Sequence, residues 1–464
     1  MTAARDLLGA ALLLAASCAR PAPVPSPPFR PAADRGEEKF LAGAVCVDLT
    51  PSRPVPLGGY GARYGAAFTA VHDRPAARAL VLRSWGRSFA IVSADLLVIP
   101  GALRAAVLAR VEDLRLDGLL LAATHTHSGP GGYWDNWLAE IAGMGDHDPE
   151  WASALADRIA RGVREASALA RPAAIRWATG EAPDLVRNRR FADGPVDSSL
   201  LLAVVEERDG GSATIATLLG FGAHPTVLGS ENRLLSADFP GVARRLFEEG
   251  TGAPALLLNG ASGDLAPVVP GGGEGFEGTD RLGRALADRF RGLRTALSTP
   301  VGAGLAACER RVRLPGVNTR GAVGPILRIL LDPLARTFTP GETVIQAVKF
   351  GDLFIAAFPC DLGSGPGLAL RETFPGPLLL VSYANDYVGY VVDDRSYARG
   401  GYEASMSFYG PGLADLLVGE ARLALEATAL LRSATASGSG GGGRRSRPRR
   451  RRGTGSGSPS PARS

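Results

Sequence analysis

Cysteine is scarce in this chain, which excludes a disulfide framework and a cysteine-based zinc site. Only four cysteines occur in 464 residues. Apart from Cys18 near the N-terminus they number three, so at most one disulfide forms among them and at least one thiol stays free. Their separations do not match the paired spacing of a zinc-binding motif. We treat Cys46, Cys308 and Cys360 as small hydrophobic residues.

The N-terminal apolar run, residues 7–16, is too short to cross a membrane. It has about ten residues where a spanning helix needs roughly 20. It ends in Leu14-Ala15-Ala16-Ser17-Cys18, which is close to the lipobox of bacterial lipoproteins. We predict an export signal over residues 1–18 and a Pro/Ala-rich linker over residues 19–38. The chain is then exported from a bacterial cell, either secreted or held as a periplasmic or outer-membrane lipoprotein by a membrane tether at Cys18.

Acidic residues are absent from the C-terminal tail. The tail after Ser433 carries eight arginines and no acid, so the net charge of +5 leaves 5 − 8 = −3 for the rest of the chain. Because the remainder is mildly acidic, we expect no nucleic-acid partner. Ala, Gly, Ser, Pro and Arg dominate residues 434–464, which predicts a disordered, solvated tail. An arginine run can also bind anionic polymers or lipid surfaces, and that alternative stays open.

The body of the chain alternates apolar runs with helical patterns. Its composition, 45% hydrophobic and 21% charged, is that of a soluble globular protein. The pattern predicts strands over 77–94 (as a hairpin), 118–123, 200–206, 214–221, 255–258, 304–314, 344–349, 353–358 and 378–382. It predicts helices over 101–114, 151–169, 239–249, 281–297, 365–373 and 414–431. This interleaving indicates an α/β fold of layered mixed β-sheets with flanking helices, in a single domain over residues 39–433.

Histidine is also scarce, and two of the five histidines stand together. His125 and His127 follow the apolar run 118–123, in a stretch that continues with Ser128, Gly129 and Pro130. In an extended segment alternate side chains share a face, so the two imidazoles can point the same way. Such a pair is half of a metal site, although paired loop histidines are also common for structural reasons.

Polar clusters follow several of the predicted strands. In α/β folds the carboxyl ends of strands are where ligands bind, because the loops converge there on a rigid floor. Five strand-end loops are therefore expected to build one site. Their metal-capable or polar residues are His125, His224, Asn259 with Asp264, Asp361, and Asn385 with Tyr387 and Tyr390.

These clusters lie in a series of short motifs over residues 42–431, in the order THTHSGPGG at 124–132, NR at 188–189, GAHPT at 222–226, NGASGD at 259–264, PCD at 359–361, NDYVGY at 385–390, GYE at 401–403 and YGP at 409–411. In these motifs the chain resembles the neutral/alkaline ceramidase family. Members of that family are zinc-dependent amidases that split ceramide into sphingosine and a fatty acid. The resemblance covers only the family's N-terminal catalytic domain, and this sequence has no room for the immunoglobulin-like domain that follows it in well-known members.

The resemblance implies one Zn²⁺ per chain. Its ligands would be His125, His224, Asp361 and Tyr390. Asp361 stands in Pro-Cys-Asp where the family has Pro-Gly-Glu, so the carboxylate arm is shorter by one methylene. Two nitrogens and two oxygens suit zinc, which activates water at neutral pH and polarises an amide carbonyl.

The resemblance also implies catalytic and substrate-binding residues. His127 and Asp264 are proton carriers in this interpretation, and Arg189 stabilises the oxyanion. Ala266 occupies the position of a family serine that is regarded as essential, so true ceramidase turnover is in question. The predicted substrate-binding residues are Gly131, Gly132, Asn188, Tyr387 and Tyr402.

Two alternatives stay open beside a zinc amide hydrolase acting on an N-acyl lipid or another small amide. One is a binuclear His-x-His metallohydrolase, and the other is a non-catalytic lipid-binding envelope lipoprotein. Single residues also have ordinary explanations. Asp361 can cap a helix, Asp264 is common in Gly-rich turns, and the tyrosines can be core aromatics with satisfied hydroxyls. The sequence predicts no oligomeric state.

Overall fold

The computed structural model describes residues 40–208, 213–300, 304–318, 332–333 and 335–436. The predicted export signal, the linker, Cys18 and nearly all of the predicted tail lie outside these residues, so those assignments stay predictions. Within the described residues no helix has the length and apolar character needed to cross a membrane.

The largest element is an eight-stranded mixed sheet with the order β11-β9-β8-β6-β1-β3-β4-β5. Its strands pair antiparallel except for two parallel pairs, β4 with β5 and β9 with β11. Most strand residues are buried, as expected for apolar runs covered on both faces. The strands are β1 (Leu41–Asp48), β3 (Ala76–Ser84), β4 (Arg87–Ala94), β5 (Gly118–Ala123), β6 (Arg171–Glu181), β8 (Ser199–Glu207), β9 (Thr214–Phe221) and β11 (Ala255–Asn259).

A second, four-stranded sheet packs face to face on the first. Its order is β13-β14-β15-β17, and only β15 and β17 pair in parallel. Side chains such as Leu82, Phe89 and Leu120 of the first sheet meet Phe350 and Ile355 of the second in one buried cluster. The strands are β13 (Leu305–Arg313), β14 (Glu342–Phe350), β15 (Leu353–Ala357) and β17 (Leu378–Val381).

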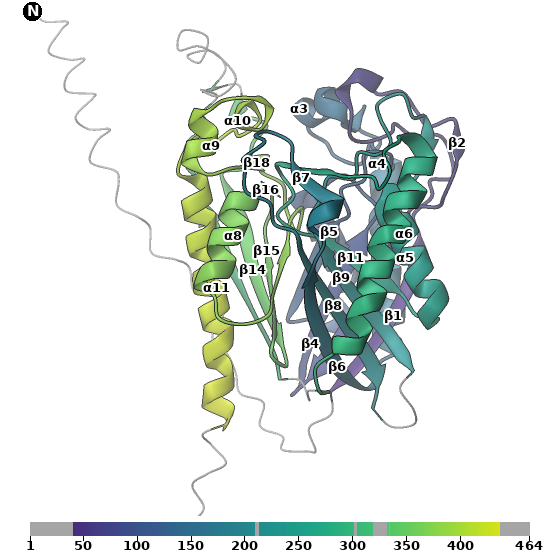
Figure 1. The fold of residues 1–464 in the computed structure, drawn as a ribbon, viewed down its shortest axis with the longest axis vertical. Helices are drawn as coiled ribbons and strands as arrows, with labels where there is room; N and C mark the ends of the chain where they lie inside the picture. Colours follow the sequence, from purple (N-terminus) through teal and green to yellow (C-terminus); the bar gives the residue numbers. More distant parts are fainter. Residues whose placement is uncertain (1–39, 209–212, 301–303, 319–331, 334, 437–464) are drawn as a thin grey trace, which may run out of the picture.

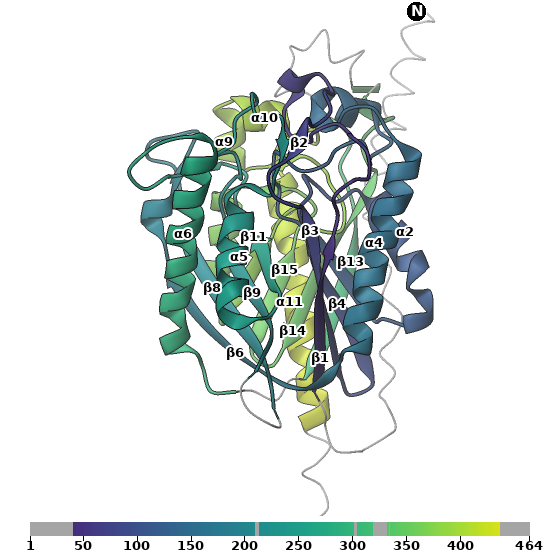
Figure 2. The same cartoon turned by 90° about the vertical axis from the view of Figure 1, so that its right-hand side faces the viewer.

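Helices cover the outer face of each sheet, so the fold has four layers (Figure 1). The pairs α2 with α4 and α5 with α6 lie beside each other over the eight-stranded sheet (Figure 2), and α8 with α11 cover the four-stranded sheet. The predicted fold class, layered mixed sheets with flanking helices, is confirmed. The helices are α2 (Gly101–Arg110), α4 (Pro149–Ala168), α5 (Asp238–Thr251), α6 (Gly275–Leu293), α8 (Ser364–Thr373) and α11 (Leu413–Ala436).

Helix α4 shows how local sequence sets these boundaries. Asp148 caps its N-terminus by accepting a hydrogen bond from Trp151 N at 3.1 Å, and Pro149 occupies the first turn. Trp151, Leu155 and Ile159 recur every four residues and are buried against the sheet. Burial of this apolar stripe holds the helix in place.

Short elements fill the connections, most of them at the end of the sheets where the strand-end loops gather. The helical turns are η2 (Gly61–Arg63), η3 (Glu112–Leu114), α3 (Trp137–Ala139), η4 (Glu140–Met144), η5 (Pro183–Leu185), η6 (Arg294–Ala296), α9 (Asp394–Ala398) and α10 (Tyr402–Ser405). The short strands are β2 (Ala70–Val71), β7 (Val186–Asn188), β10 (Leu234–Leu235), β12 (Leu265–Pro267), β16 (Asp361–Leu362) and β18 (Tyr390–Val391).

Predicted and observed elements differ mainly at helix ends. The helix predicted over 281–297 is α6, which begins at Gly275 and ends at Leu293. Its glycine-containing first turn carries no apolar repeat that a sequence pattern would register. The helix predicted over 101–114 leaves α-geometry at Val111, where the chain tightens into η3. Strands β1 and β6 were not predicted, although they join the two halves of the large sheet.

Candidate metal centre and substrate pocket

The first histidine loop begins where β5 ends. Thr124 N donates to Ala94 O at 2.8 Å and His125 N to Leu96 O at 3.0 Å, so the loop follows the strand next to it. His125 has φ 67, in the left-handed region, and the prediction of an extended segment over the pair is therefore wrong at this residue. The two imidazoles meet all the same, with His125 Nε2 3.3 Å from His127 Nε2. A strained backbone of this kind persists where surrounding contacts enforce it.

His224 lies at the end of β9 and faces the same point. Its Nδ1 donates to Ser262 O at 2.7 Å, as His125 Nδ1 donates to Leu97 O at 2.7 Å. Because a backbone carbonyl can only accept, each Nδ1 must carry the proton, and each Nε2 keeps its lone pair. Both lone pairs face into the cluster. This is the arrangement in which histidines bind metals, with the outer nitrogen anchored by a hydrogen bond.

Two oxygen groups complete the cluster. Asp361 Oδ1 lies 3.5 Å from His125 Nε2 and 3.4 Å from His224 Nε2, and Tyr390 Oη lies 3.1 Å from His224 Nε2. Strands β16 and β18 pair in parallel with Asp361 opposite Tyr390, which brings these two side chains together. The structure thus gathers all four predicted ligands.

Electrostatics favour a cation at this point. Burial lowers the pKa of His125 to about 3, and it lowers the pKa of His224 below its ordinary value, so both rings are neutral. Burial alone would raise the pKa of Asp361, but its neighbours, among them the hydroxyl of Tyr387, hold that pKa below the ordinary value. Lone pairs and a carboxylate that converge without a proton between them repel one another, and a divalent cation removes that repulsion. The nitrogen and oxygen donors present fit Zn²⁺.

His127 is the third imidazole of the cluster. The ligand nitrogens of His125, His127 and His224 all lie within 4.8 Å of one another. Its Nδ1 is buried and has no hydrogen-bond partner among the described residues, unlike the Nδ1 atoms of the other two rings. Burial holds the pKa of His127 well below its ordinary value. The ring therefore keeps one buried nitrogen without a partner among the described residues.

Arg63 fixes the backbone at His127 and is a residue that sequence analysis missed. The side chain is buried and donates to Gly58 O at 3.1 Å and to His127 O at 2.5 Å. It also donates to the carbonyls of Gly229 and Ser230, each at 3.1 Å. No ion pair of Arg63 is found within the described part of the chain, and burial lowers its pKa to about 10. The only feature of the sequence that marks this segment is the cluster of glycines around Tyr60.

We expect Arg63→Met to destabilise the loop that carries His127. The substitution keeps much of the side chain's length but removes hydrogen bonds from the buried guanidinium to four backbone carbonyls, so the free energy of unfolding should fall by about 3 kcal/mol. Urea unfolding followed by circular dichroism measures this change. Arg233→Met is the matched control, because Arg233 is exposed and donates to one surface carbonyl, that of Ala67. Equal stability of the two variants would contradict the role assigned to Arg63.

Two phenols contact the carboxylate of Asp361. Tyr383 Oη lies 3.0 Å from Asp361 Oδ1, and Tyr387 Oη donates to Asp361 Oδ2 at 2.5 Å. Tyr387 was predicted to bind substrate, and it does line the pocket described below. Tyr383 was not singled out in the sequence, because nothing in its spacing distinguishes it from a core aromatic.

Arg189 lies at the edge of the cluster, where the resemblance implied it. Its guanidinium donates to Tyr390 Oη at 3.1 Å, to Gly263 O at 3.0 Å and to Glu403 Oε1 at 2.8 Å. Its side chain is 23% exposed. Arg189 is thus a partly accessible cation held beside a predicted metal ligand, which suits stabilisation of negative charge on a substrate.

Asp264 and Asn188 contact each other. Asp264 Oδ2 accepts from Asn188 Nδ2 at 3.0 Å, and the same carboxylate accepts from the backbone and hydroxyl of Ser364 at 2.7 and 2.9 Å. Asn188 Oδ1 accepts from two backbone N–H groups, those of Arg190 and Phe191. These contacts favour a supporting role for both residues over the proton-transfer and substrate-binding roles predicted for them.

Ala266 lies on β12, opposite Arg187 of β7. This small antiparallel pair also places Leu265 opposite Asn188, so it ties the arginine loop to the Gly-Asp motif. The methyl group of Ala266 brings no nucleophile or hydrogen-bonding group to this position.

Gly131 and Gly132 serve loop packing. A Cβ on Gly131 would lie 2.3 Å from Met144 O, and Gly132 has φ 71. Gly131 N donates to Pro56 O at 2.7 Å, and Gly131 O accepts from Trp151 Nε1 at 3.0 Å. Neither glycine is among the residues that line the pocket. These contacts account for both glycines without a substrate.

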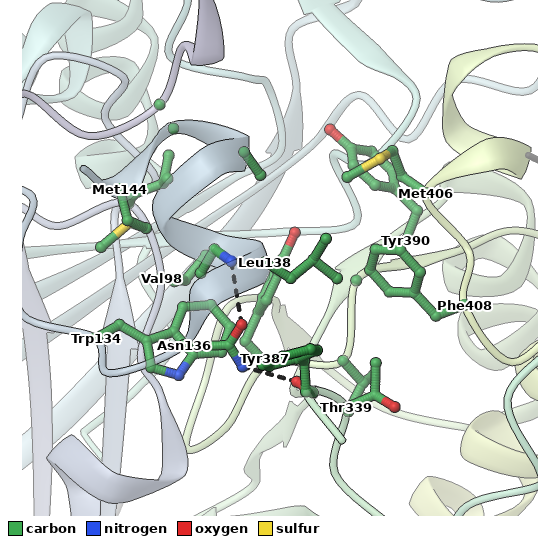
Figure 3. A pocket seen from close by; sticks show the side chains of 18 of the residues that line it. Val98, Trp134, Asn136, Leu138, Met144, Thr339, Tyr387, Tyr390, Met406 and Phe408 are labelled. Carbon is green, nitrogen blue, oxygen red and sulfur yellow. Dashed lines mark hydrogen bonds between the residues drawn. The ribbon is translucent and has the colours of Figure 1, made fainter. Parts of the chain in front are cut away.

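A pocket leads to the cluster (Figure 3). Its empty space, with the open solvent at its mouth included, is about 830 Å³. His125, His127, Tyr387 and Tyr390 form its polar end, and Tyr402, predicted to bind substrate, also lines it. The remaining wall is largely apolar, with Leu97, Val98, Trp134, Leu138, Met144, Phe338, Met406 and Phe408. Sequence analysis had left the segment around α3 and η4 uninterpreted.

The chain matches a known family over much of this structure. Residues 40–261 match the model of the neutral/alkaline non-lysosomal ceramidase N-terminal domain. A neutral ceramidase of Mycobacterium tuberculosis is 26% identical, over 76% of this chain and 71% of the relative. A neutral ceramidase of Pseudomonas aeruginosa is 24% identical, over 74% of this chain and 65% of the relative. These matches support a divergent member of the neutral ceramidase family.

Solved structures of ceramidases have the same fold. The neutral ceramidase from Pseudomonas aeruginosa superimposes with a TM-score of 0.74 at 22% identity, covering 86% of this chain and 75% of that one. A ceramidase complexed with C2 gives a TM-score of 0.73 at 22% identity, covering 85% and 76%. The family match ends at residue 261, before Asp264, Ala266 and Asp361. It therefore spans the histidine and arginine loops but not the oxygen ligands.

Proposed function

We propose that this protein is a zinc-dependent amide hydrolase that acts on N-acyl lipids of the ceramide type. The observation that carries the proposal is the convergence of His125, His224 and Asp361, each anchored from outside, in a cluster that borders an apolar pocket through His125. The relatives named neutral ceramidases support the reaction class. The pocket supports the substrate class, because an acyl chain needs an apolar wall and an amide needs a polar end.

A cation would be held by His125, His224, Asp361 and Tyr390. When bound, it supplies a Lewis acid for the amide carbonyl and lowers the pKa of water to about 7. The protein's own groups supply the rest. Tyr390 Oη accepts a hydrogen bond from Arg189, which holds the hydroxyl in place beside His224.

His127 and Arg189 act on the substrate in this proposal. His127 lines the pocket, and its neutral ring can take a proton and pass it to the leaving amine. Arg189 donates hydrogen bonds toward the oxyanion that forms as the carbonyl is attacked. The apolar wall holds the acyl chain and excludes water around the reacting amide.

Ala266 requires that water, and no side chain at this position, attacks the amide. We expect the purified full-length protein to bind one zinc per chain and to release amine from a short-chain N-acylsphingosine. Elemental analysis and an amine assay measure both quantities in the wild type and in Ala266→Ser. Turnover in the wild type would establish hydrolysis without the family serine. Zinc binding with no hydrolysis of N-acyl lipids or simpler amides by either protein would overturn the proposed function.

A binuclear centre is the second candidate, because three imidazoles lie within reach of one another. It predicts two metal ions per chain and loss of metal in His127→Ala. The mononuclear proposal predicts one ion per chain and unchanged metal content in that variant. Elemental analysis of the wild type and of His127→Ala distinguishes the binuclear from the mononuclear centre.

A further inference from the structure

The carboxylate of Asp361 is fully buried, and its two oxygens have different surroundings. Tyr387 contacts Oδ2, whereas Oδ1 contacts Tyr383 on one side and faces the two histidines on the other. Each oxygen therefore has one phenol, and only Oδ1 presents a lone pair to the centre of the cluster. A free carboxylate would rotate about its Cβ–Cγ bond and present either oxygen.

Tyr383 is itself locked in place. It has φ 55, which a non-glycine residue adopts only where its surroundings enforce it. Its N–H donates to Cys360 O at 3.1 Å, and its carbonyl accepts from Ala123 N at 3.1 Å. The residue is thus held between the end of β5, which leads to His125, and the residue before Asp361.

The ring and hydroxyl of Tyr383 reach three predicted ligands. The ring stacks on His125, with centroids 3.8 Å apart and planes inclined by 7°. The hydroxyl donates to Asp361 and pairs at 2.9 Å with Ser262 Oγ, whose backbone carbonyl accepts the proton of His224 Nδ1. Tyr383 therefore fixes the plane of the His125 ring and the rotation of the Asp361 carboxylate. Through Ser262 it also supports the ring of His224.

We propose that Tyr383 and Tyr387 are positioning residues that hold the carboxylate of Asp361 in its ligating orientation, with Tyr383 also fixing the plane of His125. This inference rests on the proposed function, since it concerns the same centre. An aspartate has a shorter arm than glutamate, so it reaches the histidines over a narrow range of orientations. The two phenols restrict it to that range.

The test is the affinity of the full-length, metal-stripped protein for Zn²⁺, measured by competition with a chromophoric chelator. Tyr383→Phe keeps the ring and its stacking and removes only the hydroxyl, and Tyr387→Phe does the same on the other side. We expect each to raise the dissociation constant about 10- to 100-fold, because losing partners of metal ligands has effects of this size. Tyr397→Phe is the control, since that buried hydroxyl has no hydrogen-bond partner among the described residues. It should leave the affinity unchanged.

Thermal unfolding of the metal-free proteins separates positioning from general stability. A positioning role predicts a large change in zinc affinity with midpoints close to that of the wild type. Dissociation constants within twofold of the wild type in both phenylalanine variants would overturn the inference, and with wild-type hydrolysis intact the proposed function would stand. A wild-type protein that binds no zinc would overturn both. A fall in the metal-free midpoint without a change in affinity would also overturn the inference.

Discussion

Replacement of His224 by alanine is expected to abolish zinc binding and to lower kcat/KM for amide hydrolysis by at least about a thousandfold. The ring is fully buried, and its Nε2 lies 3.4 Å from Asp361 Oδ1 and 3.1 Å from Tyr390 Oη, so its removal takes away the group that joins the two oxygen ligands. A metal ion contributes several kcal/mol of charge stabilisation in the transition state, and each 1.36 kcal/mol is tenfold in rate. Elemental analysis and the amine-release assay measure the two losses together.

His72→Ala is the matched control for this experiment. The His72 side chain is 46% exposed, stacks on Phe276 and contacts Asp73, none of which belongs to the cluster. We expect it to keep one zinc per chain and wild-type hydrolysis. If His224→Ala kept its zinc, or lost zinc but hydrolysed the amide at the wild-type rate, the proposed centre or its role in catalysis would be refuted.

The fold was predictable because its strands and helices carry strong periodic patterns. Short apolar runs such as residues 118–123 and 255–258 become buried strands, and α4 follows its four-residue repeat. The strand-end argument also located the histidines and Asp361, which follow β5, β9 and β15 and meet in one cluster. What the pattern could not supply was the order of strands, because β1 and β6 join the halves of the sheet through long-range pairing.

The residues around the cluster were less predictable, and for a physical reason. Arg63 and Tyr383 act through contacts between segments far apart in sequence, and the left-handed backbone at His125 and Tyr383 is imposed by those contacts. The contacts of single motif residues were not predictable either. Gly131 and Asn188 stand in the quoted motifs, and their contacts support neighbouring loops. A short motif marks where a site lies more reliably than which of its residues touch the substrate.

Arg189→Met is expected to lower kcat about 100- to 1,000-fold while changing KM much less. The guanidinium lies beside Tyr390, and a donor that acts on developing negative charge contributes about this much to the transition state and little to the bound substrate. The fold should survive, because Glu403 keeps its second partner, Arg190, at 3.2 Å. Arg189→Lys should recover little of the loss, since an ammonium group cannot contact Glu403, Gly263 O and Tyr390 with the planar geometry of a guanidinium.

Arg187→Met tests whether loss of any arginine in this segment has this effect. Arg187 lies on β7, two residues before Arg189, with its side chain exposed, so its replacement changes the net charge equally without touching the cluster. We expect its kcat and KM to match those of the wild type. Steady-state kinetics on a short-chain N-acylsphingosine, with zinc content measured in parallel, distinguish the possible outcomes. Unchanged kcat in Arg189→Met at full zinc occupancy would show that the oxyanion is stabilised by other groups. Loss of zinc in Arg189→Met would show that Arg189 acts by holding Tyr390 in place as a metal ligand.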